Sequence, residues 1–324
     1  MTAHIAVPEI TGESLPSTLS ARVLTDLLRS DLGFEGLIFT DAMDMVAVDR
    51  LYPRGEASVR AVLAGADVIL MPRDVGQAVD ALVRAVRSGR LTESRIDTSV
   101  AKLLALKERF GLPERRTVPL DEIPRVVGVP QHTEMAQEVA NRSITLLRNE
   151  RDLLPLVGTR RARVMSVSFR SRGNVLAGRY FDARLRETYP RLGTSQIDEN
   201  TNAEAYEDLL NRARRSNLVV VSIYSNFAGR VELPDETVEF VNELARRRIT
   251  HVVISFGGPY LIAEFPDAQA FVVAWSASQV SQQAAAVSLF GGIEIRGRSP
   301  TSMQPHFALG DGIQIPKKTS VNGR

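Results

Sequence analysis

Short, mostly apolar runs alternate with amphipathic segments over the first third of the chain. The apolar runs have the length of buried strands, as at Met1–Val7, Leu37–Phe39 and Val68–Met71. Around them, apolar residues recur at helical spacing, which predicts helices from Leu19 to Leu32, Glu56 to Leu63, Val75 to Val86 and Thr92 to Phe110. Fully apolar strands that alternate with amphipathic helices predict a parallel α/β arrangement.

The same alternation returns after residue 130. Apolar runs predict strands at Ala162–Phe169, Leu218–Ile223, His251–Phe256 and Ala270–Ala274, after an extended start at Thr145–Leu147. Helices are predicted at Gln131–Ile144, Ala177–Tyr189, Ala203–Arg214, Thr237–Arg247 and Gln279–Leu289. This pattern predicts a second α/β unit with an open, mostly parallel sheet. The segment between the two patterns, residues 114–130, is rich in proline and charge and is predicted to be a linker.

One carboxylate stands where catalytic groups of parallel α/β folds are found. Asp41 follows the Leu37–Phe39 strand, and α/β barrels carry their chemistry at the C-terminal ends of their strands. The alternative is that Asp41 caps the next turn or helix. Asp67 precedes a strand, at the end that is wrong for chemistry, so we predict that it is a turn residue.

Composition removes several classes of function. The net charge is +2 and arginines are scattered along the predicted helices, which indicates solvated faces and no nucleic-acid partner. There is no cysteine, so thiolate catalysis, disulfides and cysteine metal sites are excluded. The sequence has no metal-ligand spacing among its histidines and no phosphate-loop or serine-hydrolase motif, so no cofactor is expected. No apolar run is long enough to predict a membrane span, and the cellular compartment stays undetermined, with cytoplasmic and exported locations both open.

Several segments, taken in order, are typical of one enzyme family. They are Met1–Ile5, Pro16–Ser20, Leu32–Gly36, Thr40–Met45, Ala64–Pro72, Ser143–Asn149, Leu153–Leu156, Phe256–Tyr260, Gly297–Pro300 and Gly310–Gly312. With them, the chain resembles glycoside hydrolase family 3 on its β-N-acetylhexosaminidase side, over nearly its whole length. The most specific part is Thr-Asp-Ala-Met-Asp-Met at 40–45 behind Gly-Phe-x-Gly at 33–36. Family β-glucosidases more often carry Ser-Asp-Trp at that place.

The resemblance implies a retaining mechanism, in which one carboxylate attacks the anomeric carbon and a second group protonates the leaving oxygen. Asp41 matches the family nucleophile. His4, at the end of the first strand, matches a position that lines the sugar pocket; a hydrogen-bonded strand-end histidine is the alternative. Met45 is either a substrate contact or a core methionine. We assign Asp44 a structural role, as a contact between the loop and the following helix.

The resemblance also implies a fold. Residues 1–113 correspond to about the last three strands of a (β/α)8 TIM-type barrel, and 131–324 to the family's C-terminal α/β sandwich domain. Three barrel strands leave two open edges and an uncovered inner face, so residues 1–111 are expected to be marginally stable unless another element covers them.

Part of the family pattern is missing. Family hexosaminidases carry an acid/base His-Asp pair in a Lys-His-Phe-Pro-Gly-His-Gly type motif, and upstream Asp, Arg and Lys residues that hold the sugar; none of these is in the sequence. The resemblance therefore implies that Met1 matches an internal methionine. We expect the sequence to be the C-terminal part of a longer protein, with an N-terminal barrel half as a missing partner.

The expected function is removal of terminal β-linked N-acetylglucosamine, for instance from peptidoglycan fragments or chitin oligomers, with Asp41 as the nucleophile. A carbohydrate is the expected partner. Two alternatives stay open. One is a non-catalytic remnant or carbohydrate-binding subunit, and the other is a family 3 β-glucosidase.

Overall fold

The computed structural model describes residues 1–52, 55–157, 161–171, 174–224 and 233–318 of the 324-residue chain. They divide into two compact units: unit 1, Met1–Ile123, and unit 2, Pro124–Arg324. The domain ranges inferred from the sequence, with a barrel part at 1–113, a linker at 114–130 and a sandwich at 131–324, stay a prediction.

Unit 2 is built on one six-stranded sheet. The strands are β1 (Thr145–Asn149), β2 (Val164–Arg170), β3 (Gly193–Ile197), β4 (Leu218–Tyr224), β5 (His251–Ser255) and β6 (Ala270–Val273). Their spatial order is β1-β6-β5-β4-β2-β3. All neighbours run parallel except β1, which pairs antiparallel to β6. The predicted open, mostly parallel α/β sheet is therefore confirmed.

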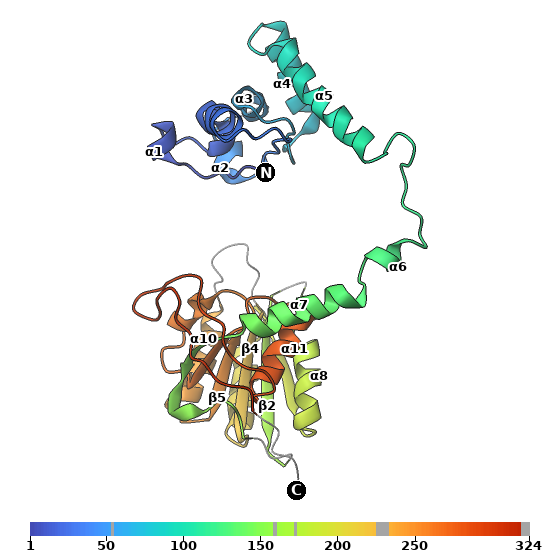
Figure 1. Ribbon diagram of the computed structural model, residues 1–324. Coiled ribbons are helices and arrows are strands. Elements are labelled where there is room, and N and C mark those ends of the chain that lie inside the picture. Colours follow the sequence, from blue (N-terminus) through green and yellow to red (C-terminus); the bar gives the residue numbers. More distant parts are fainter. Residues whose placement is uncertain (53–54, 158–160, 172–173, 225–232, 319–324) are drawn as a thin grey trace. The chain divides into compact units, whose positions relative to one another are not determined.

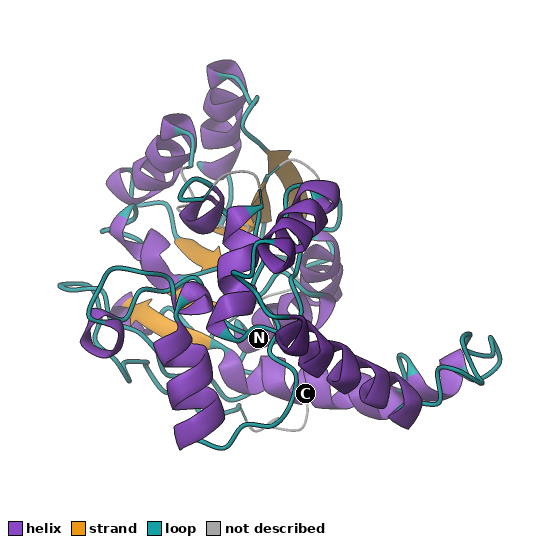
Figure 2. Ribbon diagram, turned by 90° about the horizontal axis from the view of Figure 1, so that it is seen from above, coloured by secondary structure: helices purple, strands orange, loops and turns teal. Residues whose placement is uncertain are grey.

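Helices cover both faces of this sheet (Figure 1, Figure 2). They are α7 (Pro130–Ser143), α8 (Arg179–Thr188), α9 (Ala203–Ala213), α10 (Asp235–Arg246) and α11 (Gln279–Ser288), with the short 3-10 turn η4 (Pro259–Ala263). Alternate residues of β2 and β4 face opposite sides. Val220 and Tyr224 pack with α8 and α11, whereas Val219 and Val221 pack with α9 and α10. The central strands β4, β5 and β6 are mostly apolar because both of their faces are buried.

Unit 1 is mainly helical. Its helices are α1 (Pro8–Thr11), η1 (Ser17–Leu19), η2 (Arg22–Asp31), α2 (Val46–Asp49), α3 (Glu56–Ala64), α4 (Val75–Arg87) and α5 (Glu93–Arg109), and α6 (Ile123–Val126) follows at the junction with unit 2. The side chain of Asp74 caps α4 by accepting from the Gln77 N–H, and Thr92 caps α5 by accepting from the Arg95 N–H. These caps explain why both helices begin where they do.

The three strands predicted in unit 1 are a partial error. The residues described there form no strand ladder; Phe39 and Val68 make a single parallel bridge, and the Thr2 N–H donates to the Phe39 carbonyl at 2.8 Å. The three segments thus lie in the order of consecutive parallel strands, but each meets its neighbour over too few residues to count as a strand. The predicted helix after Leu19 also differs, because η2 has π-helical hydrogen bonding.

Candidate active site

Asp41 lies at the C-terminal end of the second extended segment of unit 1. The residue before it, Thr40, is completely buried and bonds the neighbouring segment twice. Its N–H donates to the Val68 carbonyl at 3.0 Å, and its side-chain oxygen accepts from the Leu70 N–H at 2.8 Å. The main chain is therefore fixed immediately before the half-buried Asp41.

The residues after Asp41 are fixed as well. The Met43 side chain is buried, and its N–H donates to the Leu70 carbonyl at 3.0 Å. The Ala42 N–H donates to Oδ1 of Asp41 at 2.7 Å. Among the described residues, Oδ2 of Asp41 has no hydrogen-bond partner. A carboxylate held through one oxygen, with the other oxygen free, suits a nucleophile.

His4 is bound through both ring nitrogens. Its Nε2 lies 2.9 Å from the Ala42 carbonyl oxygen, and its Nδ1 lies 2.9 Å from Oγ1 of the buried Thr18. The structure thus brings His4 and Asp41 together on either side of Ala42. They lie at the C-terminal ends of the extended segments of unit 1, which we call the rim. His4 is therefore a hydrogen-bonded histidine, as in the alternative interpretation of the sequence. A contact between His4 and the sugar stays a prediction.

The structure excludes one of the two interpretations of Met45 and contradicts the role that we assigned to Asp44. Met45 is 45 % exposed, so it is not a core methionine, and its contact with substrate stays a prediction. Asp44 is exposed and has no hydrogen bond or ion pair to any residue that the structure describes. The structural role that we assigned to Asp44 was therefore wrong.

Asp67 is more than a turn residue. Its side chain is 2 % exposed, and Oδ2 lies 2.5 Å from Nη2 of Arg29 and accepts from the Ile38 N–H at 2.9 Å. Its Oδ1 accepts from Oγ of Ser99 at 2.6 Å and lies 3.6 Å from Nη1 of Arg95. Burial lowers the pKa of Arg95, and the charge of Asp67 offsets part of this effect. Asp67 sits at the end of its segment opposite to the Asp41 rim and joins η2, the Ile38 segment and α5, so it is the structural centre of unit 1.

The rim also holds a strained backbone position. Met71, at the end of the third segment, has φ of +44° and an exposed side chain. Residues other than glycine seldom adopt positive φ, and such strain often occurs at active sites.

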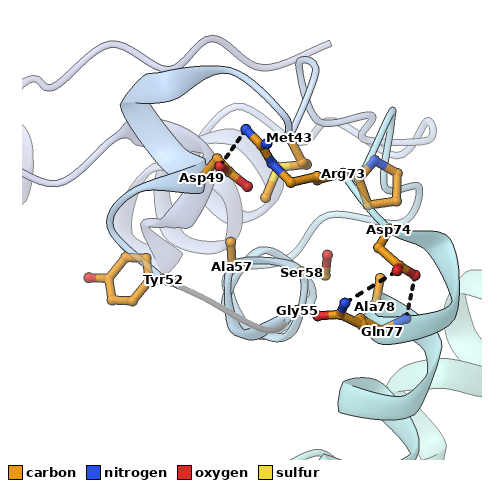
Figure 3. A pocket seen from close by; sticks show the side chains of 11 residues that line it. Met43, Asp49, Tyr52, Gly55, Ala57, Ser58, Arg73, Asp74, Gln77 and Ala78 are labelled. Carbon is orange, nitrogen blue, oxygen red and sulfur yellow. Dashed lines mark hydrogen bonds and ion pairs between the residues drawn. The ribbon is translucent and has the colours of Figure 1, made fainter.

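A small cavity of about 90 Å³ opens beside this rim (Figure 3). It is lined by Met43, Asp49, Tyr52, Gly55, Ala57, Ser58, Pro72, Arg73, Asp74, Gln77 and Ala78. Arg73 crosses it to pair with Asp49, with Nη2 2.7 Å from Oδ2. Asp41 is not among the lining residues, and the volume lies below the roughly 300–1,000 Å³ of ordinary ligand pockets. The cavity is therefore not a sugar site by itself.

Family models match both units. The description "Glycosyl hydrolase family 3 N terminal domain" matches residues 1–106, and "Glycosyl hydrolase family 3 C-terminal domain" matches residues 144–320. The chain belongs to glycosyl hydrolase family 3.

Three relatives within family 3 or its fold illustrate the match. A β-N-acetylglucosaminidase/β-glucosidase of Cellulomonas fimi is 27 % identical, over 93 % of this chain and 57 % of that protein. The solved family 3 β-N-acetylglucosaminidase of Paenibacillus sp. strain FPU-7 has a TM-score of 0.76 at 30 % identity, over 90 % of this chain and 55 % of that one. The β-glucoside phosphorylase BglX has a TM-score of 0.73 at 26 % identity, over 93 % and 57 %. The chain thus spans a little over half the length of these relatives.

Membership of family 3 confirms the resemblance drawn from the sequence motifs. Two residues that hold the Asp41 segment, Thr18 and Thr40, had no role in the sequence interpretation. Both lie within the motif segments Pro16–Ser20 and Thr40–Met45, and each has one apolar neighbour in the sequence, Leu19 or Phe39, which is a weak signal of a buried hydroxyl. No helix in the described ranges could cross a membrane, and none of their His, Asp and Glu residues form a cluster of three fit for a metal ion.

Proposed function

We propose that this chain supplies the nucleophile of a retaining family 3 glycosidase that removes terminal β-linked N-acetylglucosamine, with Asp41 as that nucleophile. The observation that carries the proposal is the geometry of Asp41. Its carboxylate stands at the C-terminal end of the extended segment Leu37–Phe39, its backbone neighbours are bound to the adjacent segment, and Oδ2 is free of partners among the described residues. The acetylglucosaminidases of Cellulomonas and Paenibacillus support the choice of sugar.

The proposed reaction has two steps. Oδ2 of Asp41 attacks the anomeric carbon as the bond to the leaving oxygen breaks, and the leaving oxygen takes a proton. This gives a glycosyl ester on Asp41. Water then attacks the same carbon, loses a proton, and releases the sugar and the Asp41 carboxylate, so that configuration is retained. We assign the proton donor of the first step to no residue of this chain.

Three competing functions remain to be tested against this proposal. The first is a β-glucosidase, because the Cellulomonas relative also carries that name. Whether the substrate must carry an acetamido group therefore needs a direct test. BglX is named a phosphorylase, in which inorganic phosphate is the acceptor in place of water. A carbohydrate-binding protein without turnover is the third possibility.

The test is turnover by the purified full chain of two aryl β-N-acetylglucosaminides, one with a dinitrophenyl leaving group and one with a poor leaving group. Each is compared with the matching glucoside, with and without inorganic phosphate. The dinitrophenyl group leaves without protonation, so its turnover isolates the nucleophile. Asp41→Ala should lower this turnover roughly 10³-fold or more. Asp44→Ala is the matched control, because it removes an exposed carboxylate three residues away without touching the rim contacts.

The outcomes separate the hypotheses. Turnover of the activated substrate alone, dependent on Asp41, supports a working nucleophile without its acid. Turnover of both substrates would place an acid in this chain. Faster turnover of the glucoside would favour the β-glucosidase, and a sugar phosphate product would favour the phosphorylase. Binding of N-acetylglucosamine without any turnover would contradict the proposal.

A further inference from the structure

The backbone of one residue, Ala42, connects His4 to Asp41 through two successive peptide groups. The Ala42 carbonyl oxygen lies 2.9 Å from Nε2 of His4, and the Ala42 N–H donates to Oδ1 of Asp41 at 2.7 Å. The orientation of Asp41 therefore depends on Ala42, and the orientation of Ala42 depends on the imidazole. The Met43 N–H shares a peptide group with the Ala42 carbonyl, and its hydrogen bond to the Leu70 carbonyl fixes that group from the other side.

The chemistry of the contact fixes one proton. A carbonyl oxygen can only accept, so Nε2 of His4 must carry hydrogen. In the neutral ring, Nδ1 then accepts from the Thr18 hydroxyl, and the Thr2 hydroxyl, whose oxygen lies 2.7 Å from Oγ1 of Thr18, donates to Thr18 in turn. In the charged ring, Nδ1 donates to Thr18, whose hydroxyl donates to the Ala3 carbonyl at 3.1 Å. The Nε2–H donor to Ala42 persists in both states.

The support behind His4 is rigid. Thr18 is completely buried in η1, and both the N–H and the hydroxyl of Ser17 donate to the Ile5 carbonyl, at 2.9 and 2.7 Å. The Thr2 N–H donates to the Phe39 carbonyl, two residues before Asp41. The imidazole is thus held on one side by a buried helix turn and reaches the Asp41 loop on the other.

We propose that His4 is a positioning residue, which holds the Ala42 carbonyl and through it the backbone of Ala42, so that the Ala42 N–H orients Asp41 and leaves Oδ2 facing substrate. This inference rests on the proposed function, because it assigns His4 a role in the nucleophilic step of Asp41. It replaces a direct sugar contact by His4. A displacement of a reacting group by about 1 Å can cost on the order of 10²-fold in rate.

The test uses the full chain with His4→Ala, His4→Gln and the control His132→Ala, which removes an exposed histidine of α7. The Gln amide nitrogen can occupy the place of Nε2 and donate to Ala42. We measure kcat and KM on the dinitrophenyl N-acetylglucosaminide. We also measure the rate at which an activated fluoro-sugar inactivator forms its ester on Asp41, identified by peptide mass.

We expect His4→Ala to lower kcat and the rate of ester formation about 10- to 100-fold, with KM changed less than about 3-fold. His4→Gln should recover most of this loss, and His132→Ala should match the wild-type chain. The pH profile of His4→Gln should keep the wild-type shape, because the Nε2 donor does not depend on the charge of the ring. A rise in KM alone would show a sugar contact, and a lost limb of the pH profile would show acid/base chemistry; either result overturns the inference.

A structural readout separates failure of the inference from failure of the proposed function. If the wild-type chain forms no ester, the proposed function fails. Hydrogen exchange at the Ala42 amide then still decides the role of His4. Exchange should be at least about 10-fold faster in His4→Ala and unchanged in His4→Gln; unchanged exchange in both variants overturns the inference. Should His4→Ala fail to fold, Thr18→Val provides the second variant, with the same expected loss in kcat and not in KM.

Discussion

At the scale of single residues, His251 is the buried ionisable group whose effect on stability is easiest to isolate. It is completely buried at the start of β5, and its Nδ1 lies 2.8 Å from the Ile249 carbonyl. Its Nε2 has no hydrogen-bond partner among the described residues. Burial lowers the pKa of His251, and the contact with Ile249 and the charge of Glu150 only partly offset this effect. The ring is therefore neutral in the folded chain at pH 7.

Acid should destabilise the chain through His251. Because its folded pKa lies below its unfolded value of about 6.5, the unfolded state binds the extra proton first as pH falls. The free energy of unfolding therefore decreases from about pH 6.5 downward, until the folded pKa is passed. His251→Asn keeps a donor for Ile249 but does not titrate, so the slope between pH 7 and 5 should become shallower in the thermal melting of unit 2. His132→Asn, at an exposed position, should keep the wild-type slope; equal slopes in all three would contradict the assignment.

The sequence located the rim residues but not the residues that hold them. Asp41 could be singled out because strand-end carboxylates are catalytic candidates in parallel α/β folds. The role of Asp67 could not, because an aspartate before a strand is most often a turn residue, and its partners Arg29 and Arg95 are far away in sequence. Asp44 shows the reverse error, since its short spacing from Asp41 suggested a contact that the structure lacks.

At the scale of elements, strands buried on both faces were the easiest to predict. The predicted ends of β2, β4, β5 and β6 agree with the structure to within two residues. β3 was missed because it is an edge strand in which exposed Thr194 and Gln196 alternate with half-buried residues, so its sequence has no apolar run. Periodicity therefore identifies a strand by its burial, and an edge strand with little burial has little signal.

The extended segments of unit 1 were also predicted to be strands because their residues are apolar. In the structure they are extended but do not pair along their length. Leu37–Phe39 and Val68–Met71 are apolar, yet strand assignment requires neighbours along their length. The structure gives them one parallel bridge, between Phe39 and Val68. What stabilises their arrangement is side-chain bonding at both ends, through Thr40 at the rim and Asp67 at the opposite end.

Asp67→Asn should destabilise unit 1 more than the removal of any exposed charged side chain of that unit. The substitution keeps the size of the side chain but leaves Arg29 and Arg95 without their shared counter-charge. Breaking a buried ion pair in this way costs about 3 kcal/mol or more. For a unit of this size, that lowers its melting temperature by more than about 10 °C. Asp44→Ala, which removes a carboxylate without described partners, should change stability by less than about 0.5 kcal/mol. Thermal melting by far-UV circular dichroism measures both, and similar melting of the two variants would contradict the central role of Asp67.

At the scale of the whole molecule, the two units differ in what they bury. Unit 2 has an apolar cluster on each face of its sheet, and these clusters include Phe181, Phe240, Phe256 and Phe271. The two clusters described in unit 1 consist of smaller aliphatic side chains, many of them alanine. Large apolar residues of unit 1, such as Phe110 and Leu32, are exposed. Since stabilisation scales with buried apolar area, unit 1 should be the weaker of the two.

A single tryptophan makes this difference measurable. Trp275 follows β6, its Nε1 donates to Oγ1 of Thr145 at 3.0 Å, and it packs on the cluster beneath α9 and α10. Tryptophan fluorescence therefore reports unit 2 alone, whereas far-UV circular dichroism reports the helices of both units. On heating, we expect the dichroism to begin its transition at a lower temperature than the fluorescence. Non-coincident probes of this kind show that unfolding is not a single two-state step.

Asp67→Asn provides the control that assigns the early phase. It should move that phase to lower temperature and leave the fluorescence transition in place, because Asp67 contacts only residues of unit 1 among those described. His251→Asn should act on the fluorescence transition instead. Coincident transitions in the wild-type chain, or a fluorescence transition that moves with Asp67→Asn, would mean that the two units unfold as one and that the larger core of unit 2 stabilises both.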